Sequence, residues 1–225
     1  MCDTRAFAVQ SGAIGLSRPV MFMPLSEGER LEGMASEILV HAPAKFALVG
    51  HDLGGMVAIE VMRRAPERVT RLALIASSAQ AETPKDAAAR DPQMIRVKAG
   101  RLDAVMRDEV IPPQIAQGPH RLAVAGLMAD MARALGPQVF QRQSRALQRR
   151  QDQQSTLRRI HVPTLILCGA RDSLTPVKRQ QFLAEMIPGA ALTVLDEAGH
   201  VPMLEKPQET TAALDAWLGA PLVLG

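Results

Sequence analysis

The sequence predicts an α/β fold with a mainly parallel sheet flanked by helices. Short apolar runs of strand length alternate with longer segments in which apolar residues recur at helical spacing, and this order is typical of parallel strands joined by helices. The chain has 225 residues, of which 47% are hydrophobic and 22% charged, so it can bury one substantial core. The hexapeptide Gly50-His51-Asp52-Leu53-Gly54-Gly55 falls between a predicted strand and a predicted helix, and it is the most informative motif of the chain.

Five elements are predicted before residue 80. Ser26 and Glu29 have the spacing of a capping box at the start of a helix, and Pro66 ends the helix that follows the hexapeptide. In order, the elements are a strand at Arg18 to Pro24, a helix at Leu31 to Leu39, a strand at Lys45 to Val49, a helix at Met56 to Arg64 and a strand at Val69 to Ala76.

Residues 81–155 have no strand pattern and form a predicted helical insertion. Prolines and Gly-Pro pairs interrupt this stretch at several points and divide it into separate helices. We therefore assign residues 1–80 and 156–225 to an α/β core and residues 81–155 to the insertion. After it, the alternation resumes with a strand at Thr164 to Cys168, a helix capped by Thr175 with Pro176 in its first turn, a strand at Ala191 to Leu195 and a helix at Leu204 to Leu218.

Composition argues against several classes of function. The N-terminus lacks the layout of a signal peptide and no apolar run reaches the roughly 18 residues of a membrane span, so we expect a cytoplasmic protein that does not bind a membrane. Cys2 and Cys168 indicate no disulfide framework. Residues 80–159 carry 14 Lys and Arg against 8 Asp and Glu, but acids are interspersed among the bases and only 3% of the chain is aromatic. This pattern favours a solvated surface over nucleic-acid binding, and it leaves the oligomeric state open.

The hexapeptide has the Gly-x-nucleophile-x-Gly pattern of a nucleophile elbow, with the carboxylate of Asp52 at the nucleophile position. A sharp turn from strand to helix needs residues without bulk, which Gly50, Gly54 and Gly55 supply. Its central residue is held in strained backbone space, which Asp tolerates better than most residues. The alternative interpretation is an ordinary turn capped by Asp52.

Asp172 and His200 each follow a predicted strand, at the carboxyl edge of the sheet. Catalytic groups of open α/β sheets gather at that edge, and the chain order of nucleophile, acid and histidine is that of a hydrolase triad. Taken singly, Asp172 could cap a loop or helix, and His200 could complete a turn. Together with Asp52 they predict a triad-like catalytic site.

These motifs resemble those of the α/β-hydrolase superfamily, specifically its small bacterial hydrolases with a helical cap. The similarity covers most of the chain and includes the hexapeptide, Arg63 to Val69, Val162 to Asp172, and Ala198 to His200 with Glu205-Lys206-Pro207. The resemblance implies an α/β-hydrolase fold in which the insertion, here called the cap segment (residues 81–155), is a lid over the active site. It implies a small-molecule substrate, with no cofactor and no metal.

Most relatives of this kind carry Ser in the elbow, and Asp is found there in the haloalkane dehalogenase and epoxide hydrolase branches. An ionised carboxylate attacks carbon without a base and forms an ester of the enzyme. His200, oriented by Asp172, would then activate water, while the backbone N–H of Leu53 helps to hold the oxyanion. With a carboxylic ester the same attack gives a mixed anhydride, which is a less natural product, and for such substrates Asp52 acting as a base on water is the favoured route.

Neither branch with an elbow Asp is matched beyond that residue. Epoxide hydrolases of this fold use cap tyrosines, and this chain has no tyrosine. Dehalogenases carry Trp or Arg directly after the nucleophile, where this chain has Leu53, and the single tryptophan, Trp217, lies on the last predicted helix. A basic cap residue, Arg133, Arg142 or Arg145, is a candidate substitute for the missing arginine.

The resemblance also concerns the start of the chain. Met1 to Thr4 resembles the stretch that follows the loop supplying the second oxyanion donor in the family. We therefore expect the first strands of the fold to be missing, one of them from between the predicted strands at Arg18 to Pro24 and Lys45 to Val49. Open ladder edges would be costly.

Two functions are consistent with these features. The first is a hydrolase that acts on a small, largely apolar ester, lactone or halogenated compound through an Asp52, His200 and Asp172 triad. The second is a catalytically inactive, truncated relative that binds a ligand or a partner.

Overall fold

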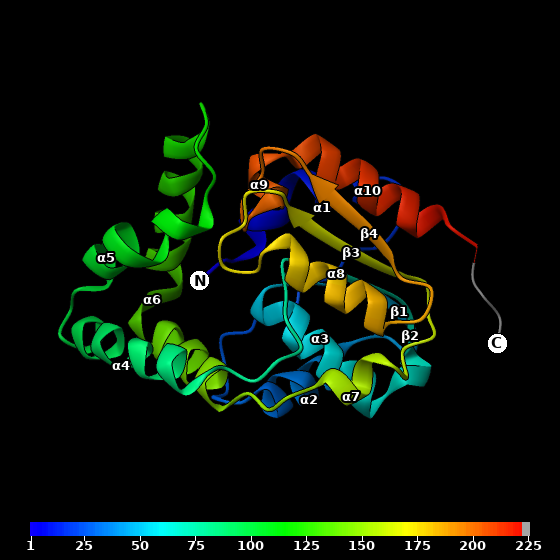
Figure 1. Ribbon diagram of the computed structural model, residues 1–225, viewed down its shortest axis with the longest axis horizontal. Helices are drawn as coiled ribbons and strands as arrows, with labels where there is room; N and C mark the ends of the chain where they lie inside the picture. The colour runs from blue at the N-terminus through cyan, green and yellow to red at the C-terminus, as the bar shows by residue number, and fades with distance from the viewer. Residues whose placement is uncertain (222–225) are drawn as a thin grey trace.

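A computed structural model describes residues 1–221, and the strands of this part form one parallel sheet in the order β1-β2-β3-β4 (Figure 1). All three neighbouring pairs are parallel, with Gly50 opposite Leu74 and Leu74 opposite Ile166 in the register. The strands are β1 (Phe46–His51), β2 (Val69–Ile75), β3 (Thr164–Gly169) and β4 (Ala191–Leu195). The predicted parallel α/β architecture is confirmed.

Helices precede, connect and follow the strands. They are α1 (Ala8–Gly15), α2 (Leu31–His41), α3 (Leu53–Arg64), α4 (Pro84–Lys98), α5 (Leu102–Val105), α6 (Arg121–Arg149), α7 (Gln154–Leu157), α8 (Val177–Met186), α9 (Pro202–Glu205) and α10 (Pro207–Gly219). Short 3-10 turns occur at η1 (Thr4–Phe7), η2 (Pro66–Arg68) and η4 (Pro112–Gln114), and a π-helical turn at η3 (Met106–Val110).

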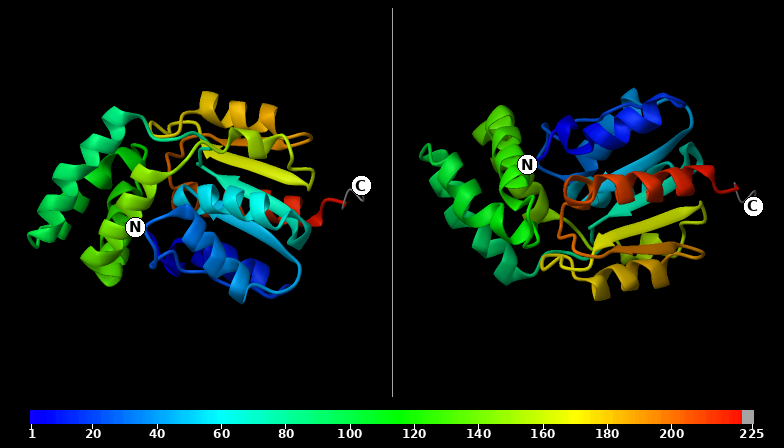
Figure 2. Two further views of the ribbon diagram at one scale, coloured as in Figure 1. Left: turned by 90° about the horizontal axis from the view of Figure 1, so that it is seen from below. Right: turned by 90° about the horizontal axis from the view of Figure 1, so that it is seen from above.

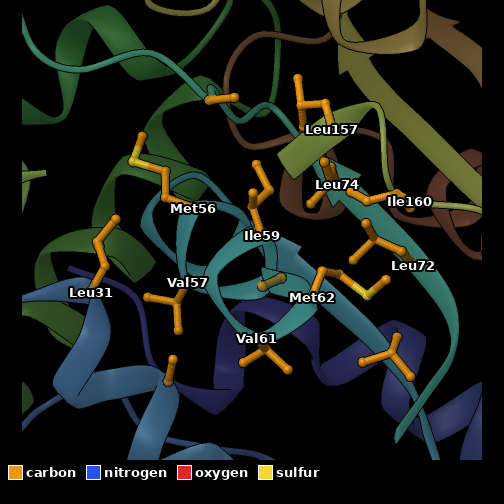
Figure 3. Packing of buried hydrophobic residues seen from close by; sticks show 14 of the residues in the cluster. Leu31, Met56, Val57, Ile59, Val61, Met62, Leu72, Leu74, Leu157 and Ile160 are labelled. Atoms are coloured by element: carbon orange, nitrogen blue, oxygen red, sulfur yellow. The ribbon is translucent and has the colours of Figure 1, made fainter. Parts of the chain in front are cut away.

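Helices cover both faces of the sheet. Side chains of alternate residues in a strand point to opposite faces, so each strand contributes to both packing layers. Leu72 and Leu74 pack beneath α3 and α2 in one cluster, whereas Ala73 and Ile75 pack against α10 in another. The two layers lie on opposite sides of the sheet in Figures 1 and 2. Figure 3 shows Ile59 of α3 among the side chains of the first cluster.

The segment between β2 and β3 is helical, and its helices α4, α5 and α6 lie beyond the carboxyl ends of the strands (Figures 1 and 2). Its longest helix, α6, changes direction at Gly136, whose φ of 81° interrupts the helix before Pro137. Met128 and Met131 are buried in an apolar cluster formed mainly by this segment, as expected for helix packing. Pro92, expected to interrupt the segment, lies inside α4.

The predicted strand at Arg18 to Pro24 is wrong. Most of this segment has no regular secondary structure, and Val20, Met21 and Phe22 are exposed. Within residues 1–221, β1 pairs with β2 alone, so the segment and β1 do not close up into neighbouring strands. An apolar segment without a ladder partner cannot satisfy its backbone groups as a strand.

Three predicted helix ends are also corrected. No capping box forms at Ser26, because α2 begins at Leu31 without a side-chain cap and the Glu29 carboxylate binds two arginines of α6. Thr175 does not cap α8, since its hydroxyl binds Asp172. The last predicted helix is two helices, α9 and α10, which meet at Lys206.

Two further observations concern the described residues as a whole. None of the helices in residues 1–221 is both long and apolar enough to cross a membrane. Cys2 and Cys168 are both free thiols, and Cys168 is fully buried in β3.

Candidate active site

Asp52 occupies the turn between β1 and α3. Its backbone has φ 47° and ψ −113°, a positive-φ conformation that non-glycine residues rarely adopt. Two contacts from the end of β2 hold it there: the Asp52 N–H donates to the Ile75 carbonyl at 3.0 Å, and the Ser77 hydroxyl donates to the Asp52 carbonyl at 2.9 Å. The neighbouring strand therefore fixes the strained residue.

At two of the three elbow glycines there is no room for a side chain. A Cβ on Gly50 would overlap the backbone of Gly54, and a Cβ on Gly55 would overlap the side chain of Ser77. A Cβ on Gly54 would meet only Leu25, at an ordinary contact distance of 3.8 Å. The expectation that all three positions exclude bulk is thus met at Gly50 and Gly55 but not at Gly54.

His200 is bonded to Asp172 across the carboxyl ends of β3 and β4. The distance from His200 Nδ1 to Asp172 Oδ2 is 2.9 Å, and both side chains are almost completely buried. The remaining capacity of the carboxylate is filled by the N–H groups of Leu174 and Thr175 at 2.8 and 3.0 Å and by the Thr175 hydroxyl at 2.6 Å. Asp172 is thereby fixed in position and orients the imidazole.

The other imidazole nitrogen faces the elbow. His200 Nε2 lies 3.8 Å from Asp52 Oδ1, and the Asp52 side chain is 37% exposed. The structure therefore brings together all three residues that the sequence placed at separate strand ends. It sets the imidazole of His200 between two carboxylates, one buried and one open to the space above the turn.

This arrangement sets the protonation of the site. Burial alone would lower the pKa of His200, but its bonds to Asp172 and its interaction with Asp52 outweigh burial and raise the pKa to about 10. Burial raises the pKa of Asp52, yet the interaction with His200 prevails and holds it well below the usual range. The pKa of Asp172 is lowered in the same way, with Thr175 adding hydrogen bonds to the effect of His200. At neutral pH the site holds an imidazolium between two carboxylates.

His51, which the sequence placed only in the elbow, supports the main chain of His200. Its Nε2 lies 2.7 Å from the His200 carbonyl oxygen. Burial and the nearby His200 charge lower the pKa of His51 to about 4, so its ring is neutral at pH 7 and donates from Nε2 to that carbonyl. Sequence reasoning missed this contact, because it joins two loops that are 149 positions apart.

Leu53 is the first residue of α3. The first N–H groups of a helix have no intrahelical acceptor and lie at the positive end of the helix dipole. The Leu53 N–H is therefore available next to the Asp52 carboxylate, and its part in holding an oxyanion stays a prediction.

The three arginines considered as substrate ligands are engaged elsewhere. Arg133 pairs with two aspartates of the cap segment, Arg142 pairs with Glu27, and Arg145 binds Glu29. Each guanidinium thus has a carboxylate partner away from the elbow. Within residues 1–221, no group of three or more His, Cys, Asp or Glu side chains is placed to hold a metal ion.

Comparison with known proteins adds a family to this geometry. The model of the Alpha/beta hydrolase family matches residues 24–214. Pimeloyl-(acyl-carrier protein) methyl ester esterase of Neisseria meningitidis serogroup B is 30% identical over 200 residues, covering 85% of this chain and 74% of that protein. A putative carbamate hydrolase, RutD, of Cronobacter sakazakii is 29% identical over 202 residues, covering 87% and 75% of the two chains.

Solved structures of the same fold also superpose on the chain. A thermophilic esterase from Thermogutta terrifontis aligns with a TM-score of 0.87 at 22% identity, covering 96% of this chain and 85% of the other. The enol-lactonase from Burkholderia xenovorans LB400 aligns with a TM-score of 0.83 at 19% identity, covering 97% and 88%. At these identities the similarity establishes the fold.

Proposed function

Because the chain belongs to the alpha/beta hydrolase family, we propose that this α/β-fold hydrolase cleaves a small, largely apolar ester or lactone through Asp52, His200 and Asp172. The observation that carries the proposal is the position of the His200 imidazole, 2.9 Å from Asp172 and 3.8 Å from a strained Asp52 at the carboxyl edge of the sheet. Structural residues rarely accept such strain together with such electrostatic coupling, whereas catalytic ones do.

The substrate class follows from two sources. The relatives are named as a methyl ester esterase, a carbamate hydrolase, an esterase and an enol-lactonase, all names of enzymes that hydrolyse a carbonyl linked to a heteroatom. The cap segment contributes an apolar cluster that reaches Val201 and Met203, next to His200. An apolar acyl or alkyl group of modest size suits such surroundings.

In the first step, the Asp52 carboxylate attacks the carbonyl carbon of the substrate. Its lowered pKa makes Asp52 a poor base toward water, but a carboxylate is already the ionised form needed for attack. The leaving oxygen takes the proton from Nε2 of the His200 imidazolium as the bond to carbon breaks. A mixed anhydride between the substrate acyl group and the Asp52 carboxylate remains, and the Leu53 N–H stabilises the oxyanion that precedes it.

In the second step, His200 becomes the base. Acylation removes the negative charge of Asp52, so the neutral imidazole has lost one of the two carboxylates that favoured its protonation. It takes a proton from water as the water oxygen attacks the anhydride. Cleavage releases the acid product, returns the Asp52 carboxylate and leaves the imidazolium in place.

The route has a leaving-group requirement. The tetrahedral adduct breaks down by losing the less basic of its two leaving groups, which are the Asp52 carboxylate and the substrate oxygen. A stabilised anion such as a phenolate or enolate therefore leaves more readily than an alkoxide. We therefore expect p-nitrophenyl esters and enol lactones to be cleaved much faster than methyl esters of the same acid. Equal rates for the two ester types would contradict rate-limiting attack by Asp52.

The decisive experiment is turnover of a panel of p-nitrophenyl esters, lactones and haloacids. The control is the Asp52→Ala, His200→Ala double variant. No turnover above the level of this variant would end the enzyme proposal and favour a binding protein. His200→Gln should give a burst of about one p-nitrophenolate per site, since the second step lacks its base, and mass spectrometry should find the acyl group on Asp52. A His200→Gln protein without burst or adduct would favour water activation by Asp52 instead.

A further inference from the structure

Glu205, at the end of α9, joins the cap segment to the loop that carries His200. Its Oε1 accepts a hydrogen bond from the N–H of Ala116 in the cap segment at 2.7 Å. Its Oε2 accepts from the N–H groups of Gly199 and Val201, on either side of His200, at 2.8 and 3.3 Å. One carboxylate therefore bridges two parts of the chain that are otherwise far apart in the sequence.

The same two segments are in direct contact. The His200 N–H donates to the Gln114 carbonyl at 2.8 Å. A Cβ on Gly199 would lie 2.8 Å from the Ala116 nitrogen and 2.9 Å from the Gln114 oxygen, so there is no room between the segments for even one methyl group. The main chain of His200 is thus held by the cap segment on one side and by Glu205 on the other.

The contact between residues 114–116 and residues 199–201 depends on the carboxylate form of Glu205. Burial raises the pKa of Glu205, although the three backbone N–H groups favour its ionised form. Both oxygens of a carboxylate accept hydrogen bonds, whereas a glutamine amide offers one acceptor oxygen and one NH₂ group that donates. Glutamine can therefore keep either the bond to Ala116 or the bonds to Gly199 and Val201, but not both.

We propose that Glu205 is a positioning residue, which holds the His200 imidazole between Asp172 and Asp52 by docking residues 114–116 of the cap segment against residues 199–201. Glu205 acts through the main chain and touches no reacting atom. The catalytic part of this inference rests on the function proposed above for His200. The structural part, the dependence of the His200 geometry on Glu205, does not.

The test is Glu205→Gln, with Glu209→Gln as the matched control. Glu209 is exposed, lies one turn further along in α10 and lines the same groove between α6 and α10. We expect Glu205→Gln to lower kcat by about 100-fold, the effect of misplacing a catalytic group by about 1 Å, with little change in KM, while Glu209→Gln leaves both unchanged. An NMR readout is independent of turnover: the His200 Nδ1 proton should move upfield, and the amides of Ala116 and Gly199 should exchange faster.

A second variant changes the same contact from the side of the cap segment. Ala116→Pro removes the N–H that binds Oε1, and the preceding residue, Ile115, already has the extended backbone that proline requires (φ −115°, ψ 128°). It should reproduce the loss of kcat and the shift of the His200 proton. An unchanged His200 proton in a folded Glu205→Gln or Ala116→Pro protein would overturn the inference. If the wild-type protein has no turnover but the proton shifts as expected, the proposed function fails and the positioning role stands.

Discussion

Replacing Asp52 by Asn removes one of the two carboxylates that flank His200, and it should lower the pKa of that imidazole. Asn has nearly the shape of Asp and also tolerates a positive φ, so the elbow should keep its backbone. His200 then retains its bond to Asp172 at 2.9 Å but loses the charge at 3.8 Å. The change isolates one electrostatic interaction.

The magnitude follows from Coulomb's law. At the 3.8 Å separation, unit charges interact with about 4 kcal/mol at an effective dielectric constant of about 20. Solvent reaches the Asp52 side chain, which is 37% exposed, and about half of that energy remains after screening. About 2 kcal/mol is therefore left, and since one pH unit corresponds to about 1.36 kcal/mol, the pKa of His200 should fall by about 1.5 pH units.

NMR titration of the imidazole nitrogens measures this change directly. The control is Asp215→Asn on the exposed face of α10, which should leave the pKa of His200 as it is. His51 does not interfere, because its pKa lies near 4. A fall of less than about 0.5 pH unit, worth under about 0.7 kcal/mol, would refute the view that Asp52 keeps His200 protonated, and with it the proposed change of His200 from acid to base.

Three further predictions concern stability. Gly55→Ala should lower the free energy of unfolding in urea by about 1 to 3 kcal/mol, because the added Cβ overlaps Ser77. Gly54→Ala should be neutral or stabilising by up to about 1 kcal/mol, and equal losses in the two variants would argue against the steric explanation. The pKa of His200 is raised on folding from 6.5 to about 10, so the contribution of its charge to the free energy of unfolding is complete below pH 6.5 and is lost as pH rises toward 10. An unfolding free energy that does not change over that pH range would contradict a protonated His200. Glu82→Gln should lower stability by about 3 kcal/mol, because the carboxylate is 3% exposed and binds two arginines, one of them itself mostly buried; unchanged thermal unfolding would show that this buried pair contributes nothing.

The sequence predicted which three side chains lie together at the carboxyl edge of the sheet better than it predicted the edges of the fold. Asp52, Asp172 and His200 could be brought together because each follows a strand, and parallel strands deliver their carboxyl ends to one edge. Their chain order then identified which residue faces which. That inference needs no side-chain contact, only the elbow motif, the chain order and the alternation of strands and helices.

The errors arise where a local pattern depends on a distant partner. Val20 to Met23 have the composition of a strand, but a strand also needs a neighbour, and none lies beside this segment in residues 1–221. Ser26 and Glu29 have the spacing of a capping box, but the Glu29 carboxylate is bound by arginines 116 and 120 positions away. Local spacing cannot reveal such competition.

The supporting residues of the site were missed for a related reason. The sequence predicts Thr175 to be a helix cap, yet its hydroxyl and N–H both bind Asp172. The spacing Asp172 to Thr175 was a usable signal, because a carboxylate commonly accepts N–H groups two and three residues ahead of it. Glu205 gave no such signal, since its partner Ala116 lies 89 positions earlier.

The residue at position 52 and the protonation state of His200 depend on each other. An alcohol at position 52 needs a neutral imidazole to take its proton, and an uncharged alcohol does not favour imidazolium. A carboxylate at the same position needs no proton removed, and its charge favours the imidazolium that protonates a leaving group. The same histidine and the same Asp172 can therefore support either order of proton transfers, and in the mechanism we propose Asp52 selects the order in which the acid acts first.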